Sequence, residues 1–317
     1  MRILITGADG FIGRVLVTRL LEAGELPGLG DSRRELVLLD RQFTSRLTDA
    51  RLRYVAADIA DPAVWHDAMR DGIDCVFHLA SVPGGAAEAN FPLGLKVNLE
   101  ATVRLLESAR QQGRVARIVF ASTIGVYGAP LPPVVDEATL PEPTLSYGAH
   151  KLVGEILITD YSRHGHIDGR CLRLPGIVAR PLQGSGLLSA FLSELIRKLW
   201  AGEPFVCPVA ADGMSWWMSR PCVVQNLLHA AALRPEQLHD RRVWLLPVIH
   251  ASMAEVVAAI ARLRGTHVLK LVSYQPDPAL QAQFADYPPL RCPTSEAAGF
   301  WHDGTLEMLV QRALEGS

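Results

Sequence analysis

The fold is decided by a stretch at the start of the chain, Arg2-Ile3-Leu4-Ile5-Thr6-Gly7-Ala8-Asp9-Gly10-Phe11-Ile12-Gly13. It opens with an apolar run typical of a buried strand, and residues 11–23 then repeat apolar side chains at the three- to four-residue spacing of a helix. The glycines in between let the backbone turn sharply and approach a pyrophosphate group at the N-terminus of that helix. We therefore predict that a dinucleotide binds against Gly7, Gly10, Phe11, Ile12 and Gly13.

Further apolar runs alternate with helical patterns through the first half of the chain. These runs are residues 36–39, 54–57, 75–79, 117–120 and 169–174. Strands that are apolar throughout and separated by helices indicate a parallel sheet covered on both faces. Right-handed crossovers then give an α/β, doubly wound (Rossmann) fold, in which ligands bind at the carboxyl ends of the strands.

Acidic residues follow the second and third predicted strands. Asp40 closes the second strand, where a carboxylate can accept hydrogen bonds from the adenosine ribose and would repel a 2′-phosphate, so NAD is favoured over NADP. The adjacent Arg41 could face a phosphate, which leaves NADP open. Asp58 and Ile59 follow the third strand and either flank the adenine or cap the helix before Pro62.

The pattern changes after Pro175, where shorter strands and helices replace the regular alternation. Prolines then divide the last third into short pieces. We predict an NAD-binding domain over residues 1–175 and a smaller α/β lobe over 176–317 that mainly binds substrate. Part of residues 215–250 is expected to pack back on the first domain.

Composition excludes several classes of function. The 317 residues carry a net charge of −2, so there is no basic excess with which to bind nucleic acid. No apolar run is long enough to span a membrane. The five cysteines form no Cys-x-x-Cys pair and His164-Gly165-His166 has no further ligand nearby, so neither a disulfide framework nor a metal site is predicted. Because an apolar strand begins at Ile3, no signal peptide is expected, and a cytoplasmic protein is predicted.

Tyr147 and Lys151 form the central catalytic candidate. Four residues apart on a helix, their side chains lie on one face, and an ammonium near a phenol lowers its pKa from about 10. Such a tyrosine can take a proton from a substrate alcohol at neutral pH. A Tyr-x-x-x-Lys pair is common on solvated helices, but here the fifth strand ends in Ser122-Thr123 and brings hydroxyls to the carboxyl edge of the sheet.

With these residues in view, the chain resembles the extended (atypical) short-chain dehydrogenase/reductase family, within the NAD-dependent epimerase/dehydratase superfamily. The motifs that carry the resemblance are Thr6-Gly7-x-x-Gly10-Phe11-Ile12-Gly13, Asp40, Asp58-Ile59, Phe77-His78-Leu79-Ala80, Asn98, Ser122-Thr123-x-x-Val126-Tyr127-Gly128 and Tyr147-x-x-x-Lys151. The resemblance implies a nicotinamide cofactor, a homodimer formed through helices, and a catalytic set of Tyr147, Lys151 and Thr123 with its neighbour Ser122. It also implies that Leu79, Ala80, Asn98, Pro175, Tyr147 and Lys151 line the cofactor.

A narrower resemblance, to the D-erythronate dehydrogenase subgroup, extends into the second lobe. It rests on residues 35–40, 87–91, 167–175, 206–209 and 217–219. It implies oxidation of the C2 alcohol of a four-carbon sugar acid with NAD, giving 2-dehydro-D-erythronate from D-erythronate. Residues 81–85 and 176–178 depart from the subgroup pattern in loops expected to face substrate, so the identity of the acid stays open.

The resulting hypothesis assigns Tyr147 as the base, with the hydride passing from C2 to the nicotinamide. Thr123, with Ser122, is expected to hydrogen-bond the developing carbonyl oxygen, and Ser81 to contact the substrate. Arg180 is the candidate for a bidentate clamp on the substrate carboxylate, with an ion pair between the lobes as the open alternative.

Two other functions are weighed against this one. A nucleotide-sugar epimerase or dehydratase would share the fold and return the hydride to its substrate. A dehydratase, however, would need an acidic pair where Ile124-Gly125 follow Thr123. A non-catalytic dinucleotide sensor would be expected to lose the tyrosine or the lysine, and this chain keeps both.

Overall fold

The computed structural model describes residues 1–24, 26–28, 34–180 and 189–315. A parallel sheet of seven strands in the order β11-β7-β5-β4-β1-β2-β3 forms its larger layer. These strands are β1 (Arg2–Thr6), β2 (Glu35–Asp40), β3 (Leu52–Ala56), β4 (Cys75–His78), β5 (Ala116–Thr123), β7 (Ile167–Leu174) and β11 (Val243–Leu245). Strand β1 lies inside the sheet, with β2 and β3 on one side of it and β4, β5 and β7 on the other. This arrangement is that of a doubly wound sheet.

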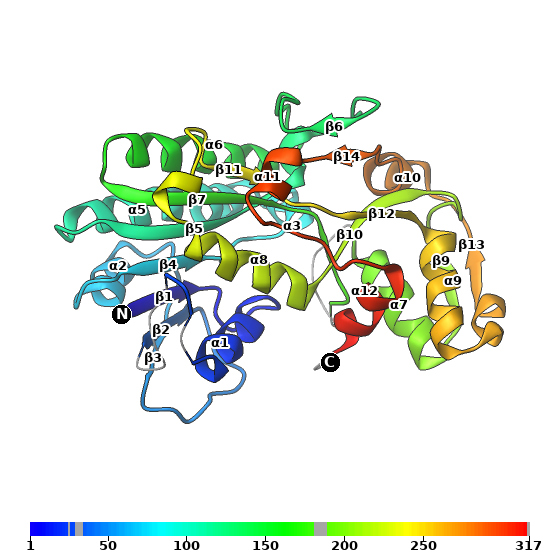
Figure 1. Cartoon of the computed structure of the whole chain (residues 1–317), viewed down its shortest axis with the longest axis horizontal. Coiled ribbons are helices and arrows are strands. Elements are labelled where there is room, and N and C mark those ends of the chain that lie inside the picture. Colours follow the sequence, from blue (N-terminus) through cyan, green and yellow to red (C-terminus); the bar gives the residue numbers. More distant parts are fainter. Residues whose placement is uncertain (25, 29–33, 181–188, 316–317) are drawn as a thin grey trace.

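Helices cover both faces of this sheet (Figure 1). One face carries α1 (Gly13–Glu22) and α8 (Arg220–Ala232), and the other carries α2 (Pro62–Met69), α5 (Ala101–Gln111) and α6 (Ser146–Arg163). Along β1, Ile3 and Ile5 pack into the first of these cores and Leu4 into the second, because successive side chains of a strand point to opposite faces. This explains why the strands are apolar throughout, and the predicted doubly wound α/β fold is confirmed.

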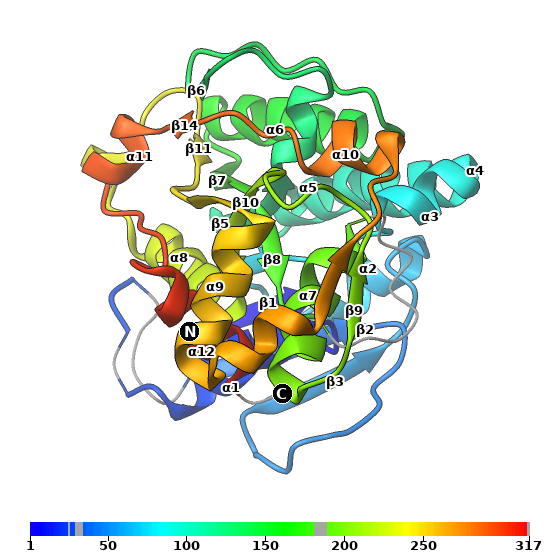
Figure 2. The same cartoon turned by 90° about the vertical axis from the view of Figure 1, so that its right-hand side faces the viewer.

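The second half of the chain builds a smaller lobe beside the carboxyl edge of the sheet (Figure 2). Its strands are β8 (Gly176–Val178), β9 (Phe205–Cys207), β10 (Met214–Ser219), β12 (Ile249–Ser252) and β13 (Val272–Tyr274). Its helices are α7 (Ala190–Ala201), α9 (Met253–Arg264), η4 (Thr266–Lys270), α10 (Pro278–Phe284) and α12 (Leu306–Leu314). Strands β12, β10 and β8 form one sheet, and β13 pairs with β9.

The remaining elements are short and lie between those already described, and two of them, β6 and β14, pair across the two halves. They are α3 (Gly84–Ala89), α4 (Phe91–Gly94), the π-helix η1 (Leu95–Glu100), η2 (Ile124–Tyr127), β6 (Val135–Asp136), η3 (Pro235–Gln237), β14 (Leu290–Arg291) and α11 (Pro293–Ala297). Two elements of the second half, α8 and β11, belong to the large sheet layer. Within the described residues, no helix is both long enough and apolar enough to cross a membrane.

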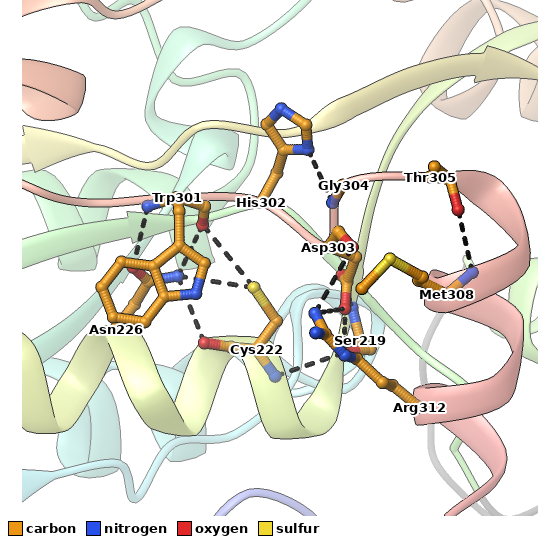
Figure 3. A network of polar contacts seen from close by, with 10 residues as sticks. All are labelled: Ser219, Cys222, Asn226, Trp301, His302, Asp303, Gly304, Thr305, Met308 and Arg312. Carbon is orange, nitrogen blue, oxygen red and sulfur yellow. Dashed lines mark hydrogen bonds and ion pairs between the residues drawn. The ribbon is translucent and has the colours of Figure 1, made fainter.

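A buried polar network fixes the C-terminal segment to the junction of the two halves (Figure 3). Ser219, the last residue of β10, caps α8 by accepting a hydrogen bond from the backbone of Cys222 at 3.2 Å. The same serine donates its N–H at 2.8 Å and its hydroxyl at 2.5 Å to the buried carboxylate of Asp303. Asn226 donates to the carbonyl of Trp301 at 2.9 Å. Because β10 pairs with β8, this network also holds the chain that follows Pro175.

Candidate active site

One cavity of about 680 Å³ lies at the carboxyl edge of the large sheet, between it and the smaller lobe. It brings together most of the residues predicted from the sequence. Those that line it are Gly7, Gly10, Phe11, Ile12, Gly13, Asp40, Asp58, Ile59, Leu79, Ala80, Ser81, Ser122, Thr123, Tyr147, Pro175 and Arg180. Lys151 and Asn98 lie behind its wall, and both are buried.

The glycine turn forms a cradle that no larger residue could form. Gly7 has φ +70, and a Cβ atom there would lie 2.9 Å from the backbone nitrogen of Ala80. A Cβ atom on Gly13 would lie only 2.1 Å from the carbonyl oxygen of Gly7. Only glycine at these positions lets the turn pack this closely on backbone, and the turn leads into α1, which begins at Gly13 with its N-terminus at the cavity. The cradle therefore fits the pyrophosphate of a dinucleotide.

The acidic residues after β2 and β3 also lie at this cavity. The carboxylate of Asp40 accepts hydrogen bonds from the backbone N–H groups of Asp9 at 2.9 Å and Arg41 at 2.8 Å. Burial raises the pKa of Asp40, and these two hydrogen bonds oppose that rise. Asp58 accepts a hydrogen bond from Ala60 at 2.9 Å, which fixes the turn that carries Ile59 into the wall.

Tyr147 lies in the first turn of α6, and hydroxyl groups surround its own. It makes hydrogen bonds with Ser81, from the loop after β4, and with Thr123, the last residue of β5. Burial raises the pKa of the tyrosine, while the positive charge of Arg180 and these two hydrogen bonds lower it. Three residues predicted to meet at the reacting centre are thus brought together, with a guanidinium beside them.

Lys151, to which the sequence assigns the charge that lowers the pKa of the tyrosine, is buried near the rings of Phe120 and Tyr147. The Nζ atom of Lys151 lies 4.6 Å from the centroid of the Phe120 ring and 5.8 Å from that of the Tyr147 ring. Burial lowers the pKa of the lysine to about 7, while Cys171 and Glu155 act in the opposite direction. Arg180 is a further positive charge near the tyrosine, and it lowers the pKa of the hydroxyl.

Ser122 does not direct its hydroxyl at the substrate, so its predicted role as a second donor to the carbonyl oxygen is wrong. The hydroxyl donates to Glu155, on α6, in a buried network. Glu155 also accepts two hydrogen bonds from Arg173, at 3.0 Å to one carboxylate oxygen and 2.7 Å to the other. Arg173 donates at 2.8 Å to the hydroxyl of Tyr127. The network ties α6 to the strands that end in Thr123 and Leu174.

Asn98 acts on the cavity through the backbone of the loop after β4. Its side-chain amide donates to the carbonyl of Val82 at 3.0 Å and accepts from the N–H of the same residue at 2.7 Å. The asparagine lies in the π-helix η1 and is almost fully buried. We describe it as a positioning residue, because the loop that it holds carries Ser81 into the cavity.

Arg180 follows β8 and reaches across the cavity toward the glycine turn. Its guanidinium lies 4.8 Å from the centroid of the Phe11 ring, and that of Arg220 lies 4.9 Å from the same ring. Arg197 holds the backbone here by donating at 2.7 Å to the carbonyl oxygen of Arg180. Within the described ranges no carboxylate pairs with Arg180, so the ion pair between lobes is not found there.

The smaller lobe forms one wall of the cavity, and the side chains of this wall were not predicted from the sequence. Its side chains come from β8, α7, β10 and α10 and from the segment between α10 and β14. They are Ile177, Leu192, Ser193, Ser215, Phe284 and Tyr287. The pair Trp216-Trp217 is buried beside this wall instead of lining it. Among the described residues, no group of three or more His, Cys, Asp or Glu side chains could hold a metal ion.

A dinucleotide cradle and a tyrosine flanked by hydroxyls in one cavity define a nicotinamide-dependent oxidoreductase of the doubly wound class. Residues 3–218 match the NAD dependent epimerase/dehydratase family, and the chain belongs to this family. The predictions of the family, of an NAD-dependent oxidoreductase and of NAD as the cofactor are confirmed.

Similar proteins span the whole chain. A D-erythronate dehydrogenase of Cupriavidus necator is 38% identical over 99% of this chain and 98% of that protein. A D-erythronate dehydrogenase of Haemophilus influenzae is 29% identical over 99% of each. Among solved structures, a nucleoside-diphosphate-sugar epimerase from Agrobacterium tumefaciens superposes with a TM-score of 0.91 at 30% identity, covering 100% of this chain and 94% of that one.

Proposed function

We propose that this protein oxidises the C2 hydroxyl of a small sugar acid with NAD, and that it converts D-erythronate to 2-dehydro-D-erythronate. The observation that carries the proposal is the position of Arg180 beside the hydroxyl of Tyr147, in the cavity that holds the dinucleotide cradle. The two D-erythronate dehydrogenases similar to this chain over its whole length support the choice of acid.

The geometry around Arg180 favours a carboxylate next to the reacting carbon. Burial lowers the pKa of this guanidinium, and the tyrosine opposes that effect. A buried guanidinium is best paired by a carboxylate, which can accept two parallel hydrogen bonds from it. Since Tyr147 is the group that meets the alcohol, a carboxylate on Arg180 belongs to the neighbouring carbon, as in a 2-hydroxy acid.

The mechanism uses three hydroxyl groups of the chain. Tyr147 takes the proton of the C2 hydroxyl, and Thr123 and Ser81 hydrogen-bond the same oxygen as it becomes a carbonyl. When bound, NAD supplies the acceptor for the hydride that leaves C2 and a positive ring that favours the phenolate. The residues that would hold NAD are those of the glycine cradle, with Asp40, Asp58, Ile59, Leu79, Ala80, Pro175 and Lys151.

An initial-rate screen for NADH formation tests this function. D-Erythronate and other four- to six-carbon aldonic and uronic acids are compared with nucleotide sugars. We expect steady NADH release with a sugar acid and none with the nucleotide sugars. Epimerisation of a nucleotide sugar without NADH release would instead support the second candidate, an epimerase, to which the similar Agrobacterium structure points.

The role of Arg180 is tested by comparing it with Arg220, which lies at a similar distance from the Phe11 ring but does not line the cavity. Losing hydrogen bonds to a charged partner costs about 1.5–3 kcal/mol. Arg180→Ala should therefore raise the KM for the acid about 10- to 150-fold and change the KM for NAD far less. Arg220→Ala should leave the KM for the acid nearly unchanged. If both variants raised the KM for the acid by the same factor, Arg180 would not be the residue that binds the substrate carboxylate.

We also propose that the protein is a homodimer that pairs through α5 and α6. Apolar side chains on these adjacent helices are exposed, namely Val103, Val153 and Ile156 at 36%, 38% and 59%. Such a patch on helices that already cover one face of the sheet fits a second copy of the same surface. Sedimentation should show a dimer that Ile156→Glu converts to a monomer, and a wild-type monomer would contradict the proposal.

A further inference from the structure

The glycine turn after β1 and the connection between β2 and β3 meet beside Asp40, at one end of the cavity. Asp40 lines the cavity, and its carboxylate accepts a hydrogen bond from the backbone N–H of Asp9 at 2.9 Å. After the larger effects of burial and of two backbone hydrogen bonds, the charge of Asp9 raises the pKa of Asp40. Two carboxylates are therefore close to each other where an adenosine ribose is expected.

The Asp9 carboxylate holds the turn and the connection together. It accepts the backbone N–H of Thr44, in the connection, at 2.9 Å. It also accepts a hydrogen bond from Nη2 of Arg14, in the first turn of α1, at 3.0 Å. The Asp9 side chain is only 11% exposed, so water and salt screen its charge less than they screen a charge at the open surface.

The guanidinium of Arg14 is committed to these contacts. Its Nε atom donates at 2.8 Å to the carbonyl oxygen of Asp9, and its Nη2 atom donates to the hydroxyl of Thr44 as well as to the Asp9 carboxylate. The Arg14 side chain is nevertheless 47% exposed, so it has room to turn to another partner. Asp9 is therefore the residue that decides where this positive charge is held.

We propose that Asp9 makes the protein select NAD over NADP, because it holds the guanidinium of Arg14 away from the 2′-phosphate of NADP. A carboxylate at the end of β2 suits the ribose hydroxyls of NAD, whereas an arginine nearby accommodates a 2′-phosphate. Arg14 has to break its ion pair with Asp9 before it can donate to a phosphate, and the carboxylate left behind repels that phosphate. The choice of cofactor does not depend on the acid that is oxidised, so this inference goes beyond the proposed function.

Binding of NAD and of NADP without substrate tests the inference, with the two dissociation constants measured by isothermal titration calorimetry. Asp9→Asn and Asp9→Ser each remove the carboxylate and keep an oxygen that can accept the Thr44 N–H. Each should lower the ratio of the Kd for NADP to the Kd for NAD about 10- to 150-fold, because charged hydrogen bonds from Arg14 become available to the phosphate. Adding Arg14→Ala to either variant should remove most of this change.

Asp49→Asn is the matched control. Asp49 pairs with Arg51 at 2.7 Å in the same connection, and neither residue lines the cavity, so this variant should leave both dissociation constants unchanged. The inference is wrong if both Asp9 variants keep the wild-type ratio, if Asp49→Asn lowers the ratio equally, or if adding Arg14→Ala leaves the whole change in place. Thermal melting without cofactor confirms that each variant is folded. Since no substrate is present, a failure of the sugar-acid activity leaves these results unaffected.

Discussion

Arg173 is a buried guanidinium and Arg180 a half-buried one that faces the cavity, and they differ in where their partners come from. Arg173 meets the carboxylate of Glu155 and the hydroxyl of Tyr127 within the chain. Arg180 has an aromatic ring at 4.8 Å and the hydroxyl of Tyr147 nearby, but no carboxylate among the described residues. A buried charge with its partner in place holds elements together, whereas one without it provides binding energy for an anionic ligand.

The same contrast separates the buried hydroxyls. Ser219 is paired with Asp303 and fixes the junction of the two halves. Ser215, four residues earlier on the same strand, has a buried hydroxyl without such a partner within the described chain. A hydroxyl with its partner in place thus fixes the scaffold, as the ion pair of Arg173 does.

The largest expected effect separates two tyrosines. Tyr147→Phe should lower kcat about 100- to 10,000-fold, because it removes the group that takes the proton. Tyr127→Phe should keep kcat within about twofold and cost about 1–3 kcal/mol of unfolding free energy, since a buried Arg173 N–H loses its acceptor. Steady-state rates and urea unfolding measure the two. A Tyr127 variant as inactive as the Tyr147 variant would break the distinction between scaffold and site.

The next effect concerns the buried ion pair. Glu155→Ala should lower the free energy of unfolding by about 3–5 kcal/mol, because it leaves the charge of Arg173 buried and unpaired. Urea unfolding measures the loss. Replacing both partners, with Glu155→Leu and Arg173→Met, should recover much of it. An equally unstable double variant would show that packing and not charge pairing governs this network.

The third effect is a pH dependence in the scaffold. Burial, with a smaller contribution from Lys151, lowers the pKa of His78 from 6.5 to about 3. Between these values the unfolded chain binds a proton that the folded chain does not, so stability falls as the pH falls from 6.5 toward 3. His78→Gln should make this fall shallower by about 1.4 kcal/mol per pH unit. Identical slopes in the two proteins would show that His78 takes up its proton without unfolding.

The smallest expected effect is a gain in the free energy of unfolding instead of a loss. Arg180→Met should raise the free energy of unfolding by about 1 kcal/mol, because it removes a half-buried charge that no described carboxylate pairs. Urea unfolding without ligands measures the change. A loss of stability as large as that of Glu155→Ala would mean that Arg180 is part of the scaffold.

The sequence predicted the parts of the site that follow directly from strand ends. The glycine turn, Asp40 and Thr123 each come directly after or at the end of an apolar strand, and parallel strands bring such ends to one edge. Ser122 was predicted wrongly although a signal was present. Neighbouring residues on a strand point to opposite faces, so Ser122 and Thr123 could not both face the substrate. Glu155 was missed, yet it lies four residues after Lys151 and hence on the same face of α6.

Other parts of the site have no local signal in the sequence. Met214 and Tyr287 are 73 positions apart in the numbering, and a backbone hydrogen bond of 3.1 Å between them brings Tyr287 to the cavity wall. Arg180 follows β8 and acts on the tyrosine across the cavity, and residue spacing gives no sign of this approach. Pairings between distant segments and burial decide such features, and neither follows from residue spacing.

The central claim is that Arg180 binds the carboxylate of the substrate. Comparing D-erythronate with erythritol as substrates tests this claim most directly. Erythritol has the same four carbons with a hydroxymethyl group in place of the carboxylate. Initial rates of NADH formation give kcat/KM for each in the wild type and in Arg180→Ala. We predict that the wild type prefers the acid and that the variant lowers this preference about 10- to 150-fold. A preference that is the same in both proteins would contradict the account.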